Sequence, residues 1–83
     1  MAEFLVEQYV PGADRAAVER CAASARRAAE TMAREGTQVR YLRSIFVPAD
    51  ETCFYLYEAA SLEAVHQAAQ RAALPYDRIA EAE

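Results

Sequence analysis

Apolar and polar residues alternate along three segments of the chain, and a period of two predicts β-strands. The alternation is clearest from Thr37 to Ala59, where two strands are joined by a turn at Val47-Pro48-Ala49-Asp50. A first strand is predicted from Glu3 to Val10 and is ended by Pro11-Gly12. A short last strand is predicted from Tyr76 to Glu81.

Two further segments have the spacing of amphipathic helices. The first runs from Asp14, a good N-cap, to Glu35, and Gly36 follows where a C′ glycine belongs. Its apolar stripe consists of Val18, Cys21, Ala22, Ala25, Ala28, Ala29 and Met32. The second begins after Ser61 and ends before Pro75. Its stripe consists of Leu62, Val65, Ala69 and Ala72.

The predicted order is β-α-β-β-α-β within a single domain, residues 1–83. Right-handed crossovers then place both helices on one face of an antiparallel sheet, which is the ferredoxin-like α+β arrangement. We expect the first strand to lie beside the second strand of the hairpin, and the last strand to lie beside the first strand of the hairpin.

Alternation also divides the strand residues between the two faces of the sheet. Those expected to point to the helices are Phe4, Val6, Leu42, Phe46, Phe54 and Leu56. Those expected to point away are Leu5, Glu7, Tyr9, Tyr41, Arg43, Ile45, Cys53, Tyr55 and Tyr57. Four of the five tyrosines fall in the second group, and so much aromatic area is unusual on a solvated face. We therefore expect a homodimer joined sheet to sheet, a dimeric α/β barrel; a different protein partner is the alternative.

The composition of the chain argues against several classes of function, among them nucleic-acid binding and membrane insertion. The chain has 54% hydrophobic residues, a net charge of −4 and a pI of about 5.0, so it is expected to fold and not to bind nucleic acid or an anionic membrane. No apolar run reaches the roughly 20 residues of a membrane span. All nine basic residues are arginines, which excludes a lysine Schiff base and a lysine general base. The absence of a basic region near Glu3 and Glu7 argues against a signal peptide, and two cysteines are too few for a disulfide framework, so a cytoplasmic location is expected.

Candidate site residues follow from the face assignment. Tyr9, Tyr41, Tyr55 and Tyr57 are expected to line either a ligand pocket or a packed interface. Glu7 is expected to pair with Arg43 on the same face, as a structural ion pair or as a ligand-binding pair. His66 and Cys53 are the candidate metal ligands, although a polar residue at the border of the helix stripe and a structural core cysteine are the simpler interpretations.

Several short motifs resemble a family of small ferredoxin-like proteins that is common in actinobacteria and includes nickel-binding homodimers. They are Phe4-Leu5-Val6-Glu7, Val39-Arg40-Tyr41-Leu42-Arg43, Cys53 with Leu56 and Glu58-Ala59, and Val65-His66. The resemblance covers roughly residues 2 to 81 and makes nickel a candidate cofactor, although the residues alone leave the cofactor unknown. Nickel-type members have histidines where this chain has Gln8 and Gln70, so the resemblance also implies a depleted ligand set.

Three hypotheses stay open from the sequence. The first is a homodimeric metal- or small-molecule-binding protein. The second is a cofactor-independent enzyme, cyclase- or monooxygenase-like, acting on a small aromatic substrate inside the dimeric barrel, which rests on fold analogy. The third is a structural or interaction module without a ligand.

Overall fold

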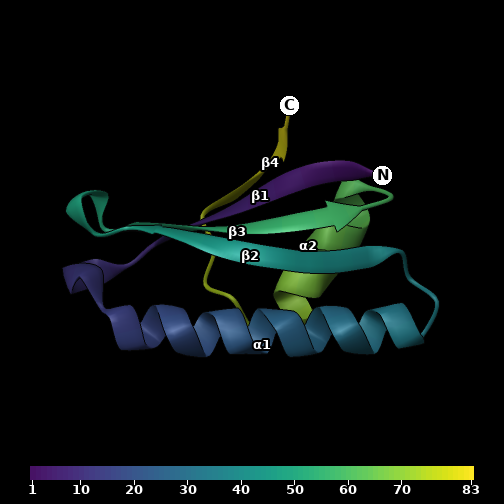
Figure 1. Cartoon of the computed structure of the whole chain (residues 1–83), viewed down its shortest axis with the longest axis horizontal. Helices are drawn as coiled ribbons and strands as arrows, with labels where there is room; N and C mark the ends of the chain where they lie inside the picture. The colour runs from purple at the N-terminus through teal and green to yellow at the C-terminus, as the bar shows by residue number, and fades with distance from the viewer.

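The computed structural model describes residues 1–83 and has the predicted order of elements (Figure 1). The strands and helices are β1 (Ala2–Tyr9), α1 (Arg15–Arg34), β2 (Val39–Val47), β3 (Thr52–Ala59), α2 (Leu62–Arg71) and β4 (Arg78–Ala82). Short 3-10 turns follow β1 (Pro11–Ala13) and β2 (Pro48–Asp50). The order β-α-β-β-α-β confirms the ferredoxin-like α+β fold.

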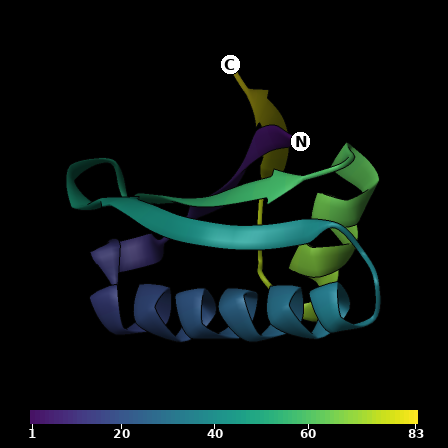
Figure 2. The ribbon, with the colours of Figure 1, turned by 45° about the vertical axis from the view of Figure 1, so that its right-hand side comes forward.

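All strand pairs are antiparallel, and the strands lie in the order β2-β3-β1-β4. Both helices lie on the same side of this sheet, and no helix covers the other side (Figures 1 and 2). The expected position of the last strand was wrong, because β4 pairs with β1 and not with β2. β1 is thus a central strand, and β2 and β4 are the two edges. Neither helix combines the length and the apolar composition of a membrane-spanning segment.

The first helix forms where its capping residues predict. The Asp14 side chain accepts a hydrogen bond from the Ala17 N–H at 3.2 Å, which satisfies a free amide of the first turn. Gly36 has a φ of 100° directly after the C-cap, a conformation that glycine adopts without steric cost. The buried side of α1 contains Val18, Ala25, Ala29 and Met32. Because the stripe is mostly alanine, the helix can pack closely against the sheet.

The second helix begins after Ser61, whose hydroxyl accepts a hydrogen bond from the Ala64 N–H at 3.2 Å. Val65 and Ala69 are buried as predicted, but Leu62 is 53% exposed. The chain leaves the helix at Ala72 and turns at Ala73, which has a φ of 57°. The helix therefore ends before it reaches Pro75.

Several residues of the β2–β3 hairpin lie on the opposite face of the sheet from the one predicted. Phe4 and Val6 of β1 are buried under the helices as expected, and their cross-strand partners Tyr57 and Tyr55 share that face. Since side chains alternate along β3, Cys53 also faces the helices, and its neighbours Phe54 and Leu56 face away. The assignment of β3 was therefore wrong.

The β2 strand changes parity within its length. Tyr41 pairs with Tyr57 but Arg43 pairs with Leu56, so the register shifts by one residue at Leu42. Such a bulge puts two residues of one strand opposite one residue of its partner. Tyr41 before the bulge is buried, which corrects its assignment, and Arg43 after it lies on the outer face as predicted.

Candidate functional site

The side of the sheet without helices, called the open face here, has an apolar centre. Leu5 of β1 pairs with Leu56 of β3, and Phe54 of β3 pairs with Ile45 of β2. These four side chains are neighbours in the register and are all at least partly accessible to water; Ile45 is 38% exposed. Soluble monomers rarely expose contiguous apolar patches of this kind. The open face is thus the strongest candidate for a functional surface.

Charged side chains surround this apolar centre. Glu7 forms an ion pair with Arg78 of β4, with Nε and Oε1 3.2 Å apart. The partner predicted for Glu7 was Arg43, and this was wrong, because β4 lies next to β1 whereas Arg43 is on β2, two strands away. Arg40 lies opposite Glu58 in the register of the same face. The open face therefore presents both signs of charge, with the two basic residues of β2 at one edge.

The predicted tyrosine pocket does not form on the open face. Tyr41, Tyr55 and Tyr57 lie beneath the helices and are at most 7% exposed, so only Tyr9 remains on the open face, where it is 55% exposed. Aromatic rings bury a large area. The other two residues of β3 on the helix side, Cys53 and Ala59, are small, so the tyrosines supply most of the buried area of this strand. These rings therefore act as core.

Two hydroxyl groups in this core have different surroundings. The Tyr55 hydroxyl donates a hydrogen bond to Oε1 of the buried Gln8 at 2.6 Å. The Tyr57 hydroxyl is buried and has no hydrogen-bond partner. Burial raises the pKa of both phenols, and it also raises the pKa of Tyr41. All three are therefore neutral near pH 7 and unsuited to act as bases there.

The candidate metal ligands are separated by the fold. Cys53 is completely buried in the core, and burial raises the pKa of its thiol. His66 is half-buried on α2, and its Nδ1 lies 2.8 Å from the Tyr76 hydroxyl. No three histidine, cysteine, aspartate or glutamate side chains come together anywhere in the chain as a group that could hold a metal ion.

Reasoning from the sequence missed Arg78, Phe54 and Leu56 as residues of the open face. Arg78 was assigned to the last strand without a role, and the other two were assigned to the core. Only the strand order places Arg78 beside Glu7. Glu7, Tyr9 and Arg43 were placed on the correct face.

Comparisons with known proteins agree with this fold. The family described as "Nickel responsive protein SCO4226-like" matches residues 4–82 of the chain. The crystal structure of SCO4226 from Streptomyces coelicolor A3(2) superposes with a TM-score of 0.74 at 22% sequence identity, covering 98% of this chain and 95% of that chain. No curated protein sequence matches the chain significantly.

Proposed function

The chain belongs to the SCO4226-like family of nickel responsive proteins, and we propose that it is a homodimer that binds a small molecule between two sheets. One observation carries this proposal: Leu5, Ile45, Phe54 and Leu56 are adjacent on a sheet face that no helix covers. Removing such apolar surface from water is the main favourable contribution to protein association. Two sheets packed face to face are a common way to cover it.

A second copy fits this face better than an unrelated partner. A two-fold interface uses the same surface on both subunits, so that surface must be self-complementary. The open face has an apolar centre together with Arg40 and Arg43 on β2 and Glu7 on β1. It can therefore pair opposite charges with a copy of itself. Domains of this size also gain stability from association, because a single small core contributes little.

The ligand is proposed to bind near Glu7 and Arg78. These side chains are joined by one contact at 3.2 Å, and they are 35% and 68% exposed in the single chain. If a second sheet covers them, they lose water, and a buried ion pair is costly unless further hydrogen bonds satisfy its remaining atoms. A small polar molecule enclosed at the interface would supply those bonds. Tyr9, two residues beyond Glu7 on β1 and on the same face, would form part of the wall of this ligand site.

Nickel does not fit the residues of this chain. Nickel sites gain affinity from several imidazoles, and this chain has one histidine, whose Nδ1 is already paired with Tyr76. Gln8 is buried and bonded to Tyr55, and Gln70 is exposed on α2. We therefore expect no tight nickel binding in calorimetric titrations with Ni²⁺. Stoichiometric submicromolar binding that is lost in His66→Ala would contradict this expectation.

Sedimentation velocity at micromolar concentration tests the dimer. Leu56→Asp places a charge at the centre of the open face, and we expect this variant to be monomeric. Leu62→Asp is the matched control, because Leu62 is an exposed leucine on α2, away from that face. A wild-type monomer would refute the homodimer, and so would a Leu56→Asp variant that stays dimeric.

Native mass spectrometry of the purified dimer tests the ligand. We expect a mass above that of two chains, which disappears in Glu7→Gln although the dimer persists. A wild-type dimer without extra mass would mean that the open face serves only to join the two chains. That result would refute the proposed binding of a small molecule. Persistence of the extra mass in Glu7→Gln would refute the assigned position of the ligand.

A further inference from the structure

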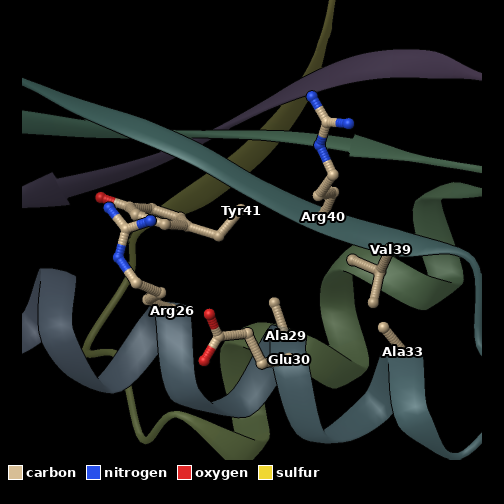
Figure 3. A pocket seen from close by; sticks show the side chains of 7 residues that line it. All are labelled: Arg26, Ala29, Glu30, Ala33, Val39, Arg40 and Tyr41. Atoms are coloured by element: carbon tan, nitrogen blue, oxygen red, sulfur yellow. The ribbon is translucent and has the colours of Figure 1, made fainter.

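A cavity lies on the helix side of the sheet, opposite the open face, between α1 and β2, and is formed by a single chain (Figure 3). Its volume is about 260 Å³. It is lined by Arg26, Ala29, Glu30, Ala33, Val39, Arg40 and Tyr41. Sites for drug-sized molecules usually occupy about 300–1,000 Å³. This cavity therefore suits a smaller molecule, of the size of one amino acid.

The part of the cavity nearest the core is apolar. Ala29 and Val39 are buried, and Ala33, which is exposed, adds to the same apolar lining. The Tyr41 ring closes one end, and it packs edge-to-face on the buried Tyr57 ring with centroids 5.6 Å apart. Because Tyr57 is fully buried, this wall is held in place from behind. The cavity thus offers a preformed apolar surface.

Two opposite charges project from α1 toward this cavity (Figure 3). Arg26 lies over the Tyr41 ring, with Cζ 5.0 Å from the ring centroid. Glu30 follows four residues later, at a spacing where side chains are neighbours on a helix and opposite charges commonly pair. They form no ion pair here, since the ion pairs of the chain are Arg71–Glu35 and Arg78–Glu7. Arg40 extends from β2 away from α1 (Figure 3).

We propose that this cavity binds a zwitterionic α-amino acid with an aliphatic side chain. The carboxylate of the ligand pairs with Arg26, and its ammonium group pairs with Glu30. Its side chain packs on Ala29, Ala33 and Val39. Charge-assisted hydrogen bonds of this kind are roughly twice as strong as neutral ones, and an arginine fork matches a carboxylate. This proposal does not rest on the dimer, because the cavity lies on the helix side of the sheet.

Titration of the ¹⁵N-labelled full chain with L-leucine, followed by NMR, tests the proposal. We expect saturable shifts of the Ala29, Ala33 and Val39 amide signals. Two analogues test the two charged groups of the ligand separately: 4-methylpentanoate lacks the ammonium group, and 3-methylbutylamine lacks the carboxylate. Each is expected to bind at least about tenfold more weakly, the equivalent of about 1.4 kcal/mol. No saturable shift at about 10 mM L-leucine, or equal binding of either analogue, would overturn the proposal.

Charge variants on the exposed surface of α1 give the second readout. Arg26→Gln and Glu30→Gln are each expected to weaken L-leucine binding at least about tenfold. The matched controls are Arg27→Gln and Glu19→Gln, exposed residues of the same helix that do not line the cavity, and they are expected to bind as the wild type does. The NMR spectra report whether each variant is folded. Unchanged binding in both cavity variants would refute the assigned contacts.

Discussion

Replacing each of the two buried tyrosines of β3 with phenylalanine is expected to change the stability of the fold in opposite directions. Tyr55 and Tyr57 are both fully buried. The Tyr55 hydroxyl is bonded to Gln8 at 2.6 Å, whereas the Tyr57 hydroxyl has no partner. Replacing either residue with phenylalanine removes one oxygen and leaves the ring in place. Comparing the two variants therefore isolates the contribution of the hydrogen bond.

The expected magnitudes follow from the surroundings of each hydroxyl. Tyr55→Phe leaves the Gln8 carbonyl oxygen buried without its hydrogen bond, which should lower the free energy of unfolding by about 1–3 kcal/mol. Tyr57→Phe removes a buried hydroxyl that was unsatisfied in the folded state. It should raise the free energy of unfolding by roughly 1 kcal/mol, since the small void left behind offsets part of the gain. For a domain of this length each kcal/mol changes Tm by about 4–8 °C.

Urea unfolding followed by far-UV circular dichroism measures both effects, and this signal depends little on the number of tyrosines. All variants must be compared at one protein concentration, because association would add to the apparent stability. The slope m should stay constant if only stability changes. Destabilisation by Tyr57→Phe as large as that by Tyr55→Phe would refute the reasoning. It would mean that the Tyr57 hydroxyl has a hydrogen-bond partner in solution, such as a buried water.

Three further predictions concern the cap of α1, the thiols and alkaline pH. Asp14→Ala should lower the free energy of unfolding by about 1 kcal/mol in the same assay, because the Ala17 N–H loses its acceptor; an unchanged midpoint would contradict the cap. Iodoacetamide at pH 8 should label Cys21, which is partly exposed, and spare the fully buried Cys53 until the chain unfolds; equal labelling by peptide mass spectrometry would contradict the burial. The three core tyrosines have a folded-state pKa raised above the ordinary value of 10.0, so they stabilise the fold below that pH. Stability should therefore fall as the pH rises above about 10, which urea unfolding at a series of pH values would detect, and a flat profile up to pH 12 would contradict it.

Much of the fold was predictable because its signals are local. Asp14 and Ser61 cap the helices, Gly36 ends the first one, and the Pro48 turn joins the hairpin strands. Each of these depends on neighbouring backbone atoms and a few side chains. The order of elements then restricts the topology to few solutions. The ferredoxin-like fold and the uncovered sheet face both followed from this.

The candidate site was only partly predictable, and in β1 the alternation of residues was enough to assign both faces. Phe4 and Val6 alternate with Leu5 and Glu7, and one set is more apolar than the other. In β3 both sets contain large apolar or aromatic residues, so alternation separates the faces without saying which one is buried. Phenylalanine and leucine were expected inside, and the tyrosines occupy that place instead.

What the sequence by itself determined is therefore the set of elements, their caps and their order. Only the tertiary structure decided which face of β3 packs on the helices. That choice depends on the shape of the space between the sheet and the helices, and on Gln8 of β1, which accepts a hydrogen bond from the Tyr55 hydroxyl. Only pairing between strands decided that Arg78 lies beside Glu7, and that the bulge at Leu42 puts Tyr41 and Arg43 on opposite faces. Local patterns report the period of a strand, whereas the contacts that select its face and register come from residues far away in the chain.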